Sequence, residues 1–143
     1  MINQSLLFEA KAFLCWEKFP NLSIKFIPIA ETVAFFHPPG RDILTINLFY
    51  EKNSQDHAQA ICLLFHEAGH VAQWQNFSAH NRINEFWNSI NLDKGEQKFN
   101  FEKQAWNLGE ELLREFLDKI NIDKNILNDV YKSYAEQSLM TYK

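Results

Sequence analysis

The spacing of apolar residues changes twice along this sequence, from helical to alternating and back to helical. Apolar residues recur every three or four positions from Leu6 to Leu14, and Pro20 interrupts this first helix. Residues 38–42 read Pro-Pro-Gly-Arg-Asp, which is typical of a turn. Three short segments around it are rich in Ile, Val, Phe and Thr, namely Ser23–Ile29, Thr32–His37 and Ile43–Tyr50. The pattern predicts an N-terminal helix followed by a three-stranded antiparallel meander.

The chain after Glu51 has helical spacing throughout. Asn53 or Ser54 can cap a helix whose apolar stripe comprises Ala58, Ile61, Cys62, Phe65, Ala68 and Ala72. Three further helices are expected over residues 83–90, over residues 99–120 and after Asp123, which can cap the last one. Strands and helices are therefore segregated along the chain, which predicts an α+β fold.

Length and composition predict a single domain over residues 1–143. The chain has 143 residues, of which 46% are hydrophobic and thirteen are Phe. This apolar content is enough for one core and is unlike that of a disordered chain. The formal net charge is −4 and no basic run is present, so we expect neither nucleic acid nor an anionic membrane surface as a partner.

The sequence also predicts a cytoplasmic location. No apolar run approaches the roughly 18 residues that a membrane span needs. The segment Met1–Ala12 mixes polar and charged residues where a signal peptide would be cationic and then apolar. Cys15 and Cys62 each stand alone within apolar helical stretches, so we expect both to be reduced core residues.

The chemistry is concentrated in residues 66–70, which read His-Glu-Ala-Gly-His and match the pattern HExxH. At about 100° per residue, His66 and His70 lie only about 40° apart on a helix, so both imidazoles can bind one ion. Glu67 lies to one side, where its carboxylate can reach a metal-activated water without becoming a ligand. The alternative is that these three side chains lie on the helix surface and bind no metal. The spacing favours a metal site with Glu67 as general base.

A zinc ion that keeps one position for water needs a third protein ligand. A metzincin would have His at position 76, but that residue is Asn76. Glu102 is the better candidate because it interrupts an otherwise apolar helical stripe, and a buried carboxylate needs a compensating cation. The alternative is a solvent-facing Glu102 near a helix start, with His80, Glu85 or Glu96 completing the site. Small residues flank the predicted site on both helices and permit close approach: Ala68, Gly69, Ala105 and Gly109.

These residues carry a family resemblance. The HExGH motif at residues 66–70, with the segment Glu102–Leu113 downstream, resembles the gluzincin pattern of ImmA/IrrE-type metallopeptidase domains. The segment Asp42–Asn47 before the predicted active-site helix resembles that family as well. The resemblance implies a minimal zincin-like domain that hydrolyses peptide bonds. It also implies that the edge strand holds an extended peptide substrate.

We therefore expect Zn²⁺ bound by His66, His70 and Glu102, with Glu67 as the catalytic base and a peptide or protein as substrate. A non-catalytic zinc-binding regulatory or protein-interaction module on the same fold is the alternative, although a purely structural site needs no base. The sequence leaves open which group stabilises the transition state, His80, Tyr50, Tyr131 or Tyr134.

Overall fold

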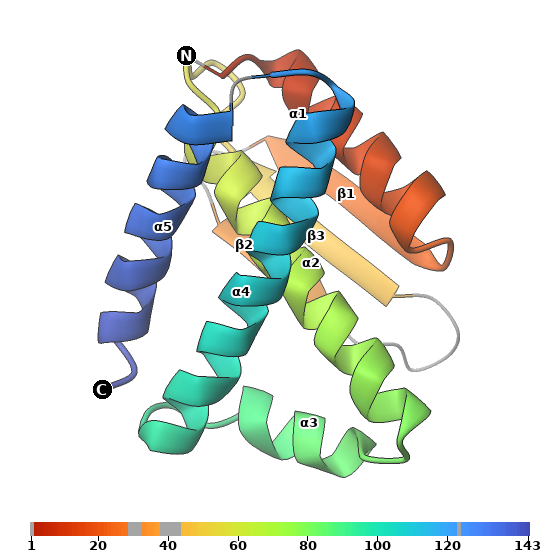
Figure 1. Ribbon diagram of the computed structural model, residues 1–143, viewed down its shortest axis with the longest axis vertical. Coiled ribbons are helices and arrows are strands. Elements are labelled where there is room, and N and C mark those ends of the chain that lie inside the picture. The colour runs from red at the N-terminus through yellow and green to blue at the C-terminus, as the bar shows by residue number, and fades with distance from the viewer. Residues whose placement is uncertain (1, 29–32, 38–43, 123) are drawn as a thin grey trace.

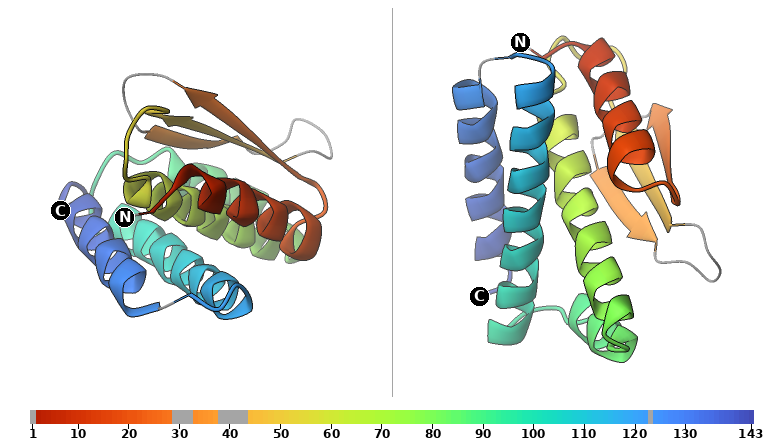
Figure 2. Two further views of the ribbon diagram at one scale, coloured as in Figure 1. Left: turned by 90° about the horizontal axis from the view of Figure 1, so that it is seen from above. Right: turned by 45° about the vertical axis from the view of Figure 1, so that its right-hand side comes forward.

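The computed structural model describes residues 2–28, 33–37, 44–122 and 124–143 (Figure 1). Its helices and strands are α1 (Gln4–Ala12), the π-helical segment η1 (Phe13–Lys18), β1 (Leu22–Pro28), β2 (Val33–His37), β3 (Leu44–Tyr50), α2 (Ala58–Ala79), α3 (Ile83–Ile90), α4 (Glu96–Lys119) and α5 (Lys124–Met140). Figure 2 shows the sheet as one layer, α1 and α2 beneath it, and α4 with α5 on the far side. One hydrophobic core contains residues of every helix and strand. The α+β class is as predicted.

The sheet is mixed, so the predicted antiparallel meander is wrong. The strand order is β1-β3-β2, with β3 antiparallel to β2 but parallel to β1. Ile46 of β3 is paired with Ile24 on one side and with Phe36 on the other. Alternation in the sequence shows which side chains face the core, but it carries no information about which strands are neighbours. The predicted turn at residues 38–42 lies outside the described residues.

The central position of β3 has a physical reason in its burial. Every second residue of β3 is buried, and these side chains are Leu44, Ile46, Leu48 and Tyr50. A central strand is shielded by a neighbouring strand at each edge, and this position suits β3 because every second side chain of β3 is buried. The strands β1 and β2 are therefore the two edges of the sheet.

The helices agree with the predicted ones except at their starts. Helix α2 begins at Ala58, so Asn53 and Ser54 are not its caps. The Asp56 carboxylate accepts the N–H groups of Ala58 and Ile2 instead, each at 3.1 Å. The long helix α4 begins at Glu96, three residues earlier than expected, after Gly95 with a φ of 105°. The predicted cap Asp123 lies outside the described residues.

Helix α2 is the centre of the molecule and contacts the sheet and all four other α-helices. It crosses α4 closely, as Figure 1 shows. A Cβ atom added at Gly69 would overlap the carbonyl oxygen of Ala105, and one at Gly109 would overlap the carbonyl oxygen of Phe65. The predicted close approach of the two helices is therefore confirmed, and both glycines are required for it. In the described part of the chain, no helix is long and apolar enough to cross a membrane.

Candidate metal centre

The crossing of α2 and α4 brings three side chains together. His66 and His70 lie one turn apart on α2, and Glu102 lies on the facing side of α4. One ligand atom from each residue falls within 4.8 Å of the others. The residues are 5%, 3% and 5% exposed, respectively. Among the described residues, the structure brings together the three predicted ligands and no other set of such groups.

The two oxygens of Glu102 have different surroundings. Oε2 is buried and lies 2.9 Å from Nε2 of His70, and among the described residues no group other than His70 contacts it as a donor. Oε1 lies 3.9 Å from Nε2 of His66. Two imidazole nitrogens and one carboxylate oxygen are a donor set that Zn²⁺ accepts, and a metal ion would satisfy the unpaired Oε2. The chemistry of these residues therefore fits a bound divalent ion.

Gln73 determines which nitrogen of His70 is free to bind an ion. Its Nε2 donates to the carbonyl oxygen of Phe101 at 2.8 Å, so its Oε1 must face the ring. Oε1 lies 2.8 Å from Nδ1 of His70. Since Oε1 can only accept, Nδ1 carries a proton, and in the neutral ring the lone pair is on Nε2. That nitrogen faces Glu102.

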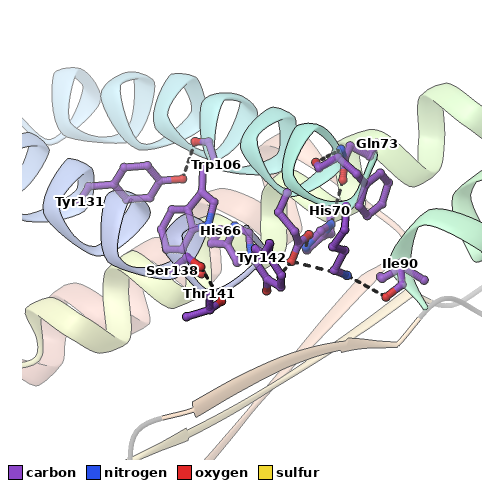
Figure 3. Close-up of polar contacts among 12 residues, drawn as sticks. His66, His70, Gln73, Ile90, Trp106, Tyr131, Ser138, Thr141 and Tyr142 are labelled. Atoms are coloured by element: carbon purple, nitrogen blue, oxygen red, sulfur yellow. Dashed lines mark hydrogen bonds and ion pairs between the residues drawn. The ribbon is translucent and has the colours of Figure 1, made fainter. Parts of the chain in front are cut away.

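Stacking positions the ring of His66. The indole of Trp106 lies parallel to it, with ring centroids 4.0 Å apart and an interplanar angle of 17° (Figure 3). Nδ1 of His66 is buried and makes no hydrogen bond. Trp106 is itself tied to α5, because the hydroxyl of Tyr131 donates to its carbonyl oxygen at 2.6 Å. The ring of His66 is therefore held by stacking on Trp106, whereas the ring of His70 is held by a hydrogen bond with Gln73.

Two polar groups contact Glu102 from outside the ligand group. The hydroxyl of Tyr142 donates to Oε1 at 3.1 Å. The ammonium of Lys98, one turn earlier on α4, lies 4.0 Å from the same oxygen. Lys98 is buried and donates to the carbonyl oxygen of Ile90 at 2.8 Å, which joins α4 to the end of α3. Glu102 thus has a cation and a hydrogen-bond donor on one side and two imidazoles on the other.

The pKa values in the ligand group are strongly shifted. Burial and the neighbouring His70 lower the pKa of His66 well below its ordinary value, so His66 is neutral. Burial acts to lower the pKa of His70, but the contact with Glu102 outweighs it and the pKa is raised. Burial acts to raise the pKa of Glu102, but His70, His66 and Lys98 together lower it to about 2. Glu102 is therefore ionised at neutral pH.

Glu67 lies beside this group without belonging to it. Its side chain is buried, and its pKa is raised to about 7, mainly because of this burial. Glu102 also acts to raise the pKa, whereas His70, the main chain of Phe36 and Lys98 act to lower it. Phe36 is on β2, an edge strand of the sheet, so this strand lies near the carboxylate.

A cavity of about 420 Å³ adjoins the group, and its walls come from α2, α4 and α5. Glu67, Glu102 and His66 all line it, so the ligand group is accessible to a small molecule or a side chain. Its other walls include Leu63, Trp106, Tyr134 and Tyr142. Tyr142 lines this cavity together with His66, and Figure 3 shows both side chains in the close-up of the site.

The remaining candidates from the sequence lie elsewhere. His80 is exposed at the end of α2, where its Nδ1 is 2.8 Å from the carbonyl oxygen of Asn76. Glu85 and Glu96 are exposed and do not reach the ligand group. Of the three predicted tyrosines, only Tyr134 lines the cavity. Tyr50 accepts a hydrogen bond from Gln4, and Tyr131 donates one to the carbonyl oxygen of Trp106. Cys62 is buried, and Cys15 is half-buried; both are free thiols.

Sequence reasoning missed three residues that make polar contacts with the ligands, Gln73, Lys98 and Tyr142. Gln73 follows His70 by three positions, so helical spacing places both on one face and could have identified it. Lys98 precedes Glu102 by four positions and was detectable in the same way. Tyr142 lies beyond the end of α5, and no local pattern connects it to Glu102.

Comparisons with protein family models, with curated proteins and with solved structures found no match for this chain. The functional assignment therefore depends on the motif and on the geometry described above.

Proposed function

We propose that this protein is a zinc-dependent peptide hydrolase. The observation that carries the proposal is the buried group of His66, His70 and Glu102, with a separate buried acid, Glu67, beside it and a cavity in front. A site that only stabilises the fold needs ligands but no additional acid. An uncoordinated carboxylate next to a ligand group is the arrangement that activation of water requires.

Zinc is the ion that the donor set suits best. His66, His70 and Glu102 would hold the ion through two imidazoles and one carboxylate, a donor set that would leave the ion able to bind water or substrate as well. The ionised Glu102 is buried, so a bound cation would offset the cost of burying its charge. When bound, such an ion would supply Lewis acidity, since a divalent metal polarises a carbonyl group and lowers the pKa of bound water toward about 7.

Glu67 acts as the general base in this proposal. Its carboxylate takes the proton from the water that attacks the carbonyl carbon, and it passes that proton to the leaving amine. The turn of helix between His66 and His70 holds Glu67 beside the ligands without making it one of them. The low exposure of the site keeps bulk water from competing for the proton.

The edge strand β2 is the surface on which we place the substrate. The main chain of Phe36 is close enough to lower the pKa of Glu67, and β2 is an edge strand of the sheet, so this strand lies near the proposed base. An extended peptide can add to such an edge through main-chain hydrogen bonds, which places its carbonyl groups along the site. The resemblance of the HExGH segment to ImmA/IrrE-type metallopeptidases also supports a peptide as the substrate.

Replacing Glu67 by Gln tests the proposal, because the amide keeps the shape but cannot accept the proton. Wild-type protein offered Zn²⁺ should bind about one equivalent, measured by elemental analysis, and His66→Ala should lose it. Glu67→Gln should keep its zinc, while cleavage of an unstructured protein or a mixed peptide library falls by about 100-fold or more.

The outcomes distinguish the proposed functions. Zinc binding without cleavage by the wild type would support the alternative, a zinc-binding regulatory or protein-interaction module. Loss of zinc from Glu67→Gln would make Glu67 a ligand and contradict its role as base. A wild-type chain that stays metal-free would refute both functions.

A further inference from the structure

Tyr142 is fixed in front of the ligand group although it lies beyond the end of α5. Its carbonyl oxygen accepts the N–H of Gly95 at 2.7 Å, immediately before α4. Its N–H donates to the carbonyl oxygen of Leu139 at 3.1 Å. The ammonium of Lys98 lies 5.4 Å from the centre of its ring. The backbone and the ring are therefore held on the first turns of α4, and the hydroxyl is directed at Glu102.

The two carboxylate oxygens of Glu102 have different contacts. Oε1 accepts the hydroxyl of Tyr142 at 3.1 Å and faces the ammonium of Lys98 at 4.0 Å. Oε2 receives no hydrogen bond from a described residue outside the ligand group and lies 2.9 Å from Nε2 of His70, the nitrogen whose lone pair Gln73 leaves free in the neutral ring. Oε1, which also lies 3.9 Å from Nε2 of His66, is thus hydrogen-bonded from outside the group, and Oε2 is presented to His70.

We propose that Tyr142 is a positioning residue that makes Glu102 a one-oxygen ligand, with Oε2 binding the ion and Oε1 held by the phenol. The inference rests on the proposed metal site. A hydrogen bond to Oε1 occupies a lone pair that would otherwise be available to the ion. A carboxylate that binds through both oxygens occupies an additional position on the ion. Tyr142 therefore keeps that position available for water and substrate.

The nearby tyrosines serve as matched controls. Tyr134 lines the same cavity, but no hydrogen bond connects its hydroxyl to Glu102. Tyr50 has a hydrogen-bonded hydroxyl on β3, where its partner is Gln4 at 2.8 Å. Tyr134→Phe therefore controls for the loss of a cavity hydroxyl, and Tyr50→Phe for the loss of a buried hydrogen bond.

The test measures the affinity for Zn²⁺ by competition with a chromophoric chelator and the visible spectrum of the Co²⁺-loaded protein. Outer contacts of a ligand commonly contribute 10- to 100-fold to metal affinity, so Tyr142→Phe should bind Zn²⁺ about 10- to 100-fold more weakly. Its Co²⁺ spectrum should lose intensity, because absorption falls when the coordination number rises above four. Tyr134→Phe and Tyr50→Phe should match the wild type in both measurements.

The outcomes separate this inference from the proposed function. Unchanged affinity and an unchanged Co²⁺ spectrum in Tyr142→Phe, with normal binding by the wild type, would overturn the role of Tyr142 alone. A wild type that binds neither ion would overturn the metal site and the inference together. If the variant does not fold, a structure of the zinc-loaded wild type decides the question. Two Glu102 oxygens at about 2.0 to 2.2 Å from the ion would overturn the inference, and one oxygen would support it.

Discussion

The imidazole of His70 is held on both sides by groups that the chain places there. Gln73 accepts from Nδ1 on one side, and the Glu102 carboxylate lies against Nε2 on the other. The amide of Gln73 cannot turn over without losing its bond to the carbonyl oxygen of Phe101. A single buried amide therefore selects the tautomer that can bind an ion.

Replacing Gln73 by Met removes the acceptor at similar side-chain length. Nδ1 of His70 then has no fixed partner, both tautomers become populated, and we expect zinc affinity to fall about 10- to 100-fold. The measurements are chelator competition for affinity and ¹⁵N chemical shifts of the His70 ring for the tautomer. Gln104→Met is the control, because it removes one acceptor of the Gln73 amide but leaves the bond to Phe101. Equal zinc affinity in Gln73→Met and the wild type would show that Gln73 does not orient the ligand.

At the scale of helices, the site depends on how closely α2 approaches α4. Gly69 lies between the two histidines and faces the carbonyl oxygen of Ala105, one turn from Glu102 on α4. Gly109 of α4 permits the same close approach at a second point of the crossing, where it faces the carbonyl oxygen of Phe65. Gly69, the glycine of the HExGH motif, therefore has a structural role that is independent of catalysis. It allows α2 and α4 to approach closely and so sets the distance between the two histidines and Glu102.

Gly69→Ala should destabilise the protein even though alanine is the better helix former. The intrinsic preference for Ala over Gly is about 1 kcal/mol, whereas overpacking commonly costs about 1 to 3 kcal/mol, and here the obstacle is backbone. We expect a lower free energy of unfolding in urea and weaker zinc binding, since α4 must move away with Glu102. Asn76→Ala is an exposed control on the same helix and should leave both quantities close to the wild type. A Gly69→Ala protein that is more stable than the wild type would contradict the close crossing.

At the scale of the whole molecule, the site joins segments that are far apart in sequence. Glu102 links α4 to α2 through His70 and to the segment after α5 through Tyr142. Lys98 extends the connection to α3 through the carbonyl oxygen of Ile90. An ion bound at this point would therefore stabilise the packing of several helices at once.

Zinc should consequently raise the stability of the entire fold, and Glu102→Gln should remove most of that gain. Binding to the folded state alone adds about 2.7 kcal/mol when free zinc is a hundredfold above its dissociation constant. Urea unfolding with added zinc and with a chelator measures the difference for each protein. Gln keeps the shape of the side chain but lacks the charge, so its zinc-dependent gain should be much smaller. Equal gains in both proteins would show that the ion binds elsewhere.

The features of the fold and site that the sequence predicted correctly are those that depend on the spacing of residues within one helix or strand. Helical periodicity placed His66 and His70 on one turn, identified Glu102 as an acid in a buried stripe, and pointed to small residues at the crossing. Alternation identified the inward face of β3. These inferences hold because a side chain's direction within a helix or strand follows from its position alone.

Tertiary structure alone decided the pairing of the strands and the outer contacts of the ligands. The parallel pairing of β1 with β3 depends on the path of the intervening chain, which alternation does not encode. The bond from Gln73 to Phe101 spans 28 positions, and that from Tyr142 to Glu102 spans 40. Such contacts arise only after α4 and α5 have packed against α2, because packing rather than periodicity brings those side chains within hydrogen-bond distance.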